Sequence, residues 1–148
     1  MCGGLIYITV NFNVKNIFIG IQFEENENLN QIIKIINEKK ICINILEKGN
    51  KLSLDNNIYI DILFPIRKEE IENNSINNNS LVFKLIYKEW SILFTGDIEE
   101  EAEEKLVYLY KENLECDILK VAHHGSKTSS INEFIQYANP KIALIGVG

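Results

Sequence analysis

The second half of the chain alternates short apolar segments with helical patterns, and this order limits the fold more than any other feature. The segments follow as strand, strand, helix, strand, helix and strand, over residues 80–87, 91–97, 98–112, 117–124, 130–138 and 141–147. Ser130 and Glu133 have the spacing of a capping box that opens the second helix, and Pro140 marks its end. The last segment is apolar throughout, which is typical of a parallel strand.

The first half of the chain is rich in predicted strands. Leu5–Val10 and Ile17–Ile21 are dense in β-branched and aromatic residues, so both are predicted to be strands. Isoleucines recur at helical spacing over residues 28–40, which predicts a helix. Three further strands are expected as a meander, over residues 41–46, 51–54 and 58–65. The tract NNSINNN at 73–79 is predicted to be a polar loop that buries no apolar area.

Length and composition favour one globular domain and exclude several classes of protein. A chain of 148 residues that is 46% hydrophobic can bury a core, and the element order favours an α/β sandwich over residues 1–148. No apolar run approaches the ~18 residues of a membrane span, and no signal peptide is visible, which predicts a cytoplasmic chain. No glycine-rich nucleotide motif occurs.

The charge distribution gives no sign of a nucleic-acid surface. The net charge is −6 and no basic stripe occurs, which argues against binding that depends on neutralising phosphates. The acidic run EEEAEE at 99–104 is interpreted as the solvated face of a helix.

Two predicted strands end in residues that bind metals in other proteins. LFTGD places Asp97 directly after a strand, and KVAHHGS places His123 and His124, the only two histidines, after another. Each has a simpler explanation: Asp97 as a helix cap, and the histidines as solvated rings at a strand end. A carboxylate and an imidazole from neighbouring strand ends would form half of a divalent metal site. It is only half, because a catalytic metal needs at least three protein ligands.

The motifs NNNS, TGD and HHGS occur in this order within residues 77–126. With them, the stretch from Lys48 to Gly148 resembles the metallo-β-lactamase-like domain of ComEC-type competence proteins. The segments GGLIYI and FNVKNIFI resemble the same family. The resemblance implies an αββα sandwich, here partial, with a two-metal site that activates water against phosphodiesters or related esters.

The resemblance also assigns roles to residues of this chain. Asp97 matches the aspartate that bridges the two ions, and His124 matches the final histidine ligand. His123 is expected to be a catalytic group beside the ligands, or a weaker ligand. Four more residues are expected to line the site or to contact a phosphate: Asn79, Ser80, Ser126 and Lys127.

The sequence departs from the family pattern at both ends. The first metal motif, of HxDxDH type, is expected just before Gly3, where this chain has only Met1 and Cys2. The chain also ends at IGVG, where family members usually continue. We therefore expect a fragment lacking its main ligands: the complete parent binds zinc or manganese, and this chain alone binds little metal and hydrolyses nothing.

Three functions stay open for the parent. The first is a metal-dependent hydrolase acting on DNA phosphodiesters. The second is a hydrolase of a small phosphoester or lactone, and the third is an inactive interaction or structural remnant. A membrane anchor in the parent is left open. Because Leu5–Val10 would be an unpaired apolar strand in a fragment, we also expect a homodimer through these N-terminal strands.

Overall fold

The computed structural model describes residues 3–21 and 27–146, and these divide into two compact units. The first unit comprises Met1–Ile19 and Phe23–Ile45, and the second comprises Gly20–Gln22 and Leu46–Gly148. Each unit has its own cluster of buried hydrophobic side chains. The single domain expected over residues 1–148 stays a prediction. None of the described helices has the length and apolar character needed to cross a bilayer.

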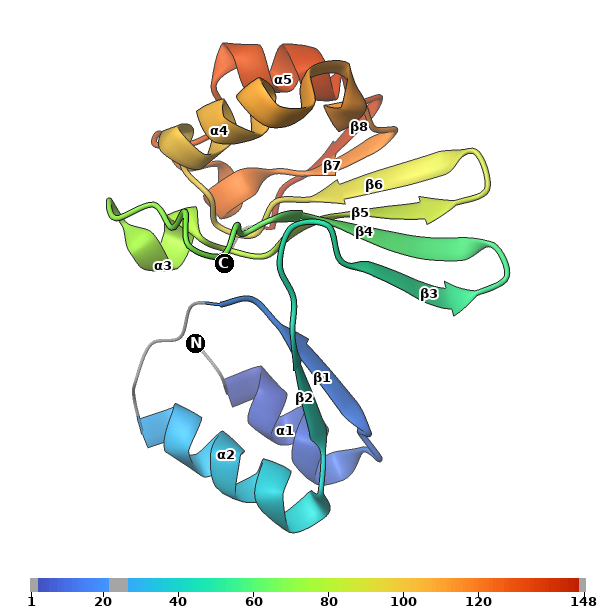
Figure 1. The fold of residues 1–148 in the computed structure, drawn as a ribbon, viewed down its shortest axis with the longest axis vertical. Coiled ribbons are helices and arrows are strands. Elements are labelled where there is room, and N and C mark those ends of the chain that lie inside the picture. The colour runs from blue at the N-terminus through green and yellow to red at the C-terminus, as the bar shows by residue number, and fades with distance from the viewer. Residues whose placement is uncertain (1–2, 22–26, 147–148) are drawn as a thin grey trace. The chain divides into compact units, whose positions relative to one another are not determined.

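The first unit combines two helices with a two-stranded parallel sheet. In chain order its elements are α1 (Gly3–Asn11), β1 (Asn16–Ile19), α2 (Glu27–Lys39) and β2 (Cys42–Ile45) (Figure 1). Two of the isoleucines that predicted α2, Ile32 and Ile36, are buried together with Ile17 and Ile41, whereas Ile33 is exposed. β2 pairs with β1 rather than joining the expected meander, so that part of the prediction is wrong.

The predicted strand at Leu5–Val10 is wrong, because these residues lie in helix α1. The side chain of Thr9 turns back along the helix and donates hydrogen bonds to the carbonyl oxygens of Leu5 and Ile6, at 2.9 and 3.0 Å. Lys39 Nζ donates to the carbonyls of Thr9 and Val10, at 2.7 and 2.8 Å, which satisfies acceptors that the last turn of a helix leaves free. A short apolar run does not reveal such partners.

The homodimer expected through N-terminal strands therefore loses its structural basis. Helix α1 offers no strand edge on which a second chain could pair. It does expose large apolar side chains, namely those of Tyr7, Ile8 and Val10. Self-association stays a prediction, and it would have to use a helix face.

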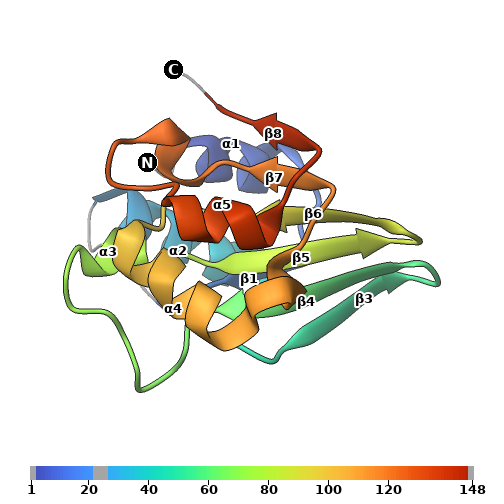
Figure 2. The same ribbon diagram turned by 90° about the horizontal axis from the view of Figure 1, so that it is seen from above.

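The second unit contains a six-stranded mixed sheet whose strands lie in sequence order. The strands are β3 (Lys51–Asp55), β4 (Ile58–Phe64), β5 (Val82–Tyr87), β6 (Trp90–Phe94), β7 (Ile118–Lys120) and β8 (Ile142–Leu144). Neighbours from β3 to β6 are antiparallel, and β6, β7 and β8 are parallel. The helices α4 (Glu100–Tyr110) and α5 (Asn132–Ala138) lie on the same side of this sheet (Figures 1 and 2).

The core of the second unit lies between this face of the sheet and the two helices. Phe64, Leu93 and Leu119 from the strands and Leu106 and Phe134 from the helices are at most 1% exposed. Burying each such side chain contributes about 1.5–3 kcal/mol, so the core anchors the strands whose ends carry the candidate site.

The last strand is less buried than its sequence suggests. Ile142 and Leu144 of β8 are 48% and 51% exposed, although the apolar run indicated a buried parallel strand. β8 is an edge strand of the sheet. Its apolar side chains therefore have few partners among the described residues.

Helix α5 is capped by another helix and not by its own capping box. No side chain of its own caps α5. Instead Glu103 of α4 accepts hydrogen bonds from the backbone N–H groups of Ser130 and Ile131, both at 2.8 Å. Glu103 is completely buried, and this burial raises the pKa of its carboxyl. The interpretation of residues 99–104 as a solvated face is therefore wrong for this glutamate.

Candidate functional site

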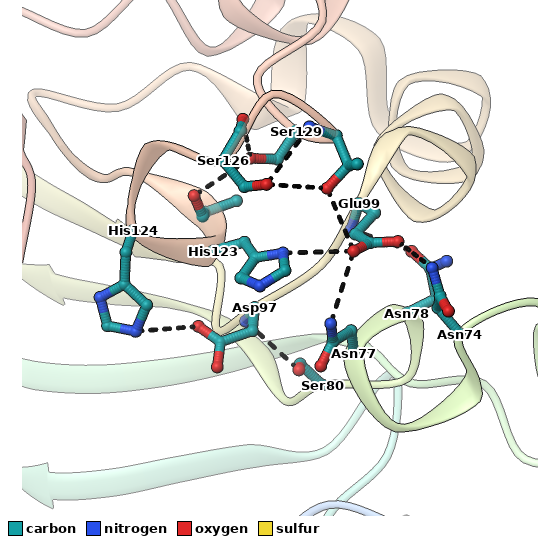
Figure 3. A network of polar contacts seen from close by, with 12 residues as sticks. Asn74, Asn77, Asn78, Ser80, Asp97, Glu99, His123, His124, Ser126 and Ser129 are labelled. Carbon is teal, nitrogen blue, oxygen red and sulfur yellow. Dashed lines mark hydrogen bonds and ion pairs between the residues drawn. The ribbon is translucent and has the colours of Figure 1, made fainter.

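Asp97 and His124 meet where two neighbouring parallel strands end. Asp97 follows β6 and His124 follows β7, and the carboxyl ends of parallel strands lie at one edge of a sheet. Asp97 Oδ1 is 3.7 Å from His124 Nε2 (Figure 3). The expected juxtaposition of the two side chains is confirmed.

The turn that carries Asp97 depends on a glycine. Gly96 has a φ of 61°, and a Cβ atom there would lie 2.6 Å from the Cβ of Ser80. The close approach allows Ser80 Oγ to accept a hydrogen bond from the backbone N–H of Asp97, at 3.3 Å. The buried Thr95 donates to the carbonyl of Lys120 at 2.6 Å, which joins the ends of β6 and β7.

The two histidines lie in a tight turn. The sequence had suggested that they lie at the end of a strand, and this part of the prediction is wrong. β7 ends at Lys120, and residues 122–125 form a turn whose backbone is not helical at His123 and His124. His123, His124 and Gly125 have φ values of 44°, 53° and 75°. A non-glycine residue in this left-handed region costs roughly 1–2 kcal/mol, and such strain gathers at functional sites. The backbone N–H of His123 donates to the carbonyl of Gly96 at 3.2 Å, so the two turns support each other.

The ring of His124 is oriented by a backbone carbonyl. Its Nδ1 lies 2.8 Å from the carbonyl oxygen of Gly146. Because a carbonyl only accepts, Nδ1 carries the proton in this contact, and Nε2 points toward Asp97. Either a proton on Nε2 or a metal cation between Nε2 and the carboxylate would stabilise this arrangement. Lys120 Nζ already supplies one positive charge, 3.7 Å from Asp97 Oδ1.

The ring of His123 faces a different carboxylate. Its Nδ1 lies 3.2 Å from Glu99 Oε1 but is not aligned for a hydrogen bond, so this buried nitrogen has no hydrogen-bond partner among the described residues. Figure 3 shows the two histidines directed to two different acids, His123 to Glu99 and His124 to Asp97.

Glu99 is the residue that the sequence analysis missed. It is only 7% exposed, and its carboxylate accepts hydrogen bonds from Asn74 Nδ2 at 2.6 Å, Thr128 Oγ1 at 3.1 Å and Asn77 Nδ2 at 3.4 Å. The hydrogen bond from Asn74, helped by those from Thr128 and Asn77, lowers the pKa of Glu99. In the sequence, only its position two residues after Asp97 could have pointed to Glu99. Its hydrogen-bond donors lie in distant segments of the chain.

The four residues expected to line the site have different environments in the structure. Asn79 is 1% exposed, and its amide is engaged by the backbone of Ile71 and Ser75, so it supports the 71–80 segment and does not line the site. Ser80 contacts Asp97, as described above. Ser126 Oγ is 3.1 Å from Thr128 Oγ1. Lys127 lines a hollow of about 660 Å³ together with Glu99 and Thr128.

The described side chains do not by themselves fit a bound metal ion. Within residues 3–21 and 27–146, no group of three or more histidine, cysteine, aspartate or glutamate residues could hold one. Asp97 and His124 supply two donors, whereas a catalytic zinc ion needs three protein ligands. Their assignment as metal ligands, and that of His123 as a catalytic group, stays a prediction.

The chain is similar in sequence to several known proteins. Residues 76–148 match the family model described as the metallo-beta-lactamase superfamily. ComE operon protein 3 of Bacillus subtilis is 33% identical over 91% of this chain and 17% of its own length. Competence protein ComA of Neisseria gonorrhoeae is 35% identical over 56% of this chain and 12% of its own. The uncharacterized protein YcaI of Escherichia coli is 46% identical over 49% of this chain and 10% of its own. The chain thus spans less than a fifth of each relative.

Proposed function

Because this chain is an α/β metallo-β-lactamase domain, related to ComE operon protein 3 over 91% of its length and to competence protein ComA over 56%, we propose that it belongs to a metal-dependent hydrolase of DNA phosphodiesters. In this proposal Asp97 and His124 are two ligands of a divalent ion, zinc or manganese. The described residues do not supply the remaining ligands.

The observation that carries the proposal is the orientation of His124 toward Asp97. The two side chains approach to 3.7 Å, and the carbonyl of Gly146 holds the opposite nitrogen of the ring. Histidines that bind metals commonly donate their other N–H to a carbonyl or carboxylate in this way. The strained turn at residues 123–125 is held in place by the neighbouring turn at Gly96. These contacts support the proposal because they hold both side chains at the same edge of the sheet.

DNA is proposed as the substrate because of the relatives and not because of charge. The name of one relative, competence protein ComA, associates it with competence, and the net charge of −6 does not favour phosphate binding by the surface as a whole. A divalent ion would supply positive charge locally, where the phosphate has to bind. Lys120 and Lys127 add two cationic side chains near the two turns.

A metal titration followed by NMR tests the proposal. Adding zinc or manganese to the purified chain should shift or broaden the ring signals of His124, and Asp97→Asn should abolish the effect. If the ring signals of His124 do not respond up to about 1 mM metal, the binding free energy is weaker than about −4 kcal/mol, and this would contradict the proposed function. With only two ligands, we expect no DNA hydrolysis by this chain. Turnover that Asp97→Asn abolishes would show that further ligands exist.

The contact between Lys120 and Asp97 favours a second candidate, a metal-free interaction module. Lys120 Nζ donates to the carbonyl of Gly96 at 2.7 Å and lies beside the carboxylate that a metal ion would need. In this case the ammonium group permanently neutralises Asp97. Neither the natural chain nor Lys120→Met would then bind a divalent ion.

A further inference from the structure

We propose that Glu99 is a positioning residue, which orients the ring of His123 so that Nδ1 is held by the protein and Nε2 is left free. The proposal deepens the proposed function and rests on it, because it adds a residue to the same site. Glu99 would act only through His123 and would not touch the substrate.

The first observation is the unsatisfied nitrogen of His123. Its Nδ1 is buried and lacks a hydrogen bond in the described part of the chain, yet Glu99 Oε1 lies 3.2 Å away. Unpaired buried polar atoms are rare in folded proteins, and each one needs a physical explanation. Hydrogen bonds between catalytic groups are often poorly aligned without substrate and tighten when it binds. The contact has the distance of such a hydrogen bond but not yet its alignment.

The second observation is that the carboxylate of Glu99 is held from several sides. Asn74 donates to Oε2, and Asn77 and Thr128 donate to Oε1. The backbone N–H of Glu99 donates to Asn78 Oδ1 at 2.9 Å. The donors to the carboxylate come from two places, 74–77 and 128, that are far apart in the chain. The position of the carboxylate is therefore fixed by its hydrogen bonds, and the ring of His123 orients relative to it.

The third observation is that this carboxylate is buried and does not cap its own helix. Glu99 stands at the start of α4, but its side chain makes no capping hydrogen bond to that helix. Burying a charge is costly unless the charge is paired. His123 is the one ion-pair partner of Glu99 in the described ranges.

The two histidines would then share one protonation pattern. A carboxylate, like a carbonyl, only accepts a hydrogen bond, so Glu99 would keep the proton on Nδ1 of His123, as Gly146 does for His124. Both rings would present Nε2 as an acceptor. This is the form in which an imidazole can bind a metal ion or accept a proton.

NMR of the chain with ¹⁵N-labelled histidine, without metal, tests the proposal. Long-range proton–nitrogen correlations report which ring nitrogen carries the proton. We expect the Nδ1–H form for neutral His123, loss of its predominance in Glu99→Met, and partial retention in Glu99→Gln, which keeps an acceptor oxygen. His124 should not change. Glu103→Gln is the matched control, because Glu103 is also a buried glutamate but accepts hydrogen bonds from the backbone of Ser130 and Ile131 instead.

An unchanged His123 spectrum in folded Glu99→Met, or predominance of the Nε2–H form in the natural chain, would overturn the proposal. If Glu99→Met does not fold, Glu99→Gln decides: its effect on His123 must exceed that of Glu103→Gln. No metal or substrate takes part in this experiment. A failed metal titration at His124 would therefore refute the proposed function without touching this result, and the reverse also holds.

Discussion

Replacing Gly96 by alanine should destabilise the second unit and disturb the candidate site together. Two separate costs are expected. The backbone of Gly96 is left-handed, with a φ of 61°, and an alanine there costs roughly 1–2 kcal/mol. The new Cβ would also lie 2.6 Å from the Cβ of Ser80, an atom that cannot move without its backbone. Overpacking of this kind costs about 1–3 kcal/mol, which gives a total of roughly 2–5 kcal/mol.

Gly49→Ala provides the matched control, because it carries only the first cost. Gly49 also has a positive φ, of 91°, but nothing lies within 4 Å of the position its Cβ would take. Both glycines lie in the second unit. The difference between the two variants therefore isolates the steric contact with Ser80, about 1–3 kcal/mol.

Urea unfolding measures the free energy of unfolding of both variants. The fluorescence of Trp90, the only tryptophan, reports on the unit that contains both glycines. With a slope of about 2 kcal/mol/M, a difference of about 2 kcal/mol separates the two midpoints by about 1 M. Equal midpoints for Gly96→Ala and Gly49→Ala would refute the argument, because the contact with Ser80 would then be relieved without cost.

Three further predictions follow from other contacts. Lys120→Met should tighten divalent-metal binding at Asp97 about tenfold, roughly 1.4 kcal/mol, as measured by calorimetric titration, because a competing positive charge 3.7 Å away is removed. Burial raises the pKa of Glu103, so its contribution to stability is greatest below the ordinary glutamate pKa of 4.5 and declines as the pH rises through the raised value. Glu103→Gln should remove that decline from urea midpoints measured across pH. Phe134→Ala should cost about 3–5 kcal/mol in urea unfolding, whereas Tyr108→Ala, at an 81% exposed side chain, should cost little.

Features encoded by neighbouring residues were predictable from the sequence. Isoleucines at helical spacing predicted α2, and short apolar segments predicted β5 and β6. The juxtaposition of Asp97 and His124 was also predictable, because each follows a strand and the carboxyl ends of parallel strands share an edge. These features follow from neighbouring residues alone and do not depend on contacts made elsewhere in the fold.

Features that depend on distant partners were not predictable. The helix at Leu5–Val10 has its C-terminal carbonyls satisfied by Lys39, which a local pattern does not show. Glu99 and Glu103 resemble a solvated acidic run, but their hydrogen-bond donors come from the 74–77 and 128–131 segments. Buried polar residues are defined by the partners they meet, and these are set by the fold.

The mixed sheet of the second unit also has a consequence for the order of folding. β3–β4 and β5–β6 are hairpins, whereas β7 and β8 join the sheet only through helical crossovers. Contacts that close long loops form more slowly, because the chain entropy is lost before the contacts form. Asp97 follows a hairpin strand and the histidines follow a crossover strand, so the candidate site lies on the boundary between early and late folding. A brief opening of the turn after β7 would take the site apart while the hairpins stay intact, and hydrogen exchange should detect it as faster exchange at 121–129 than in β5 and β6.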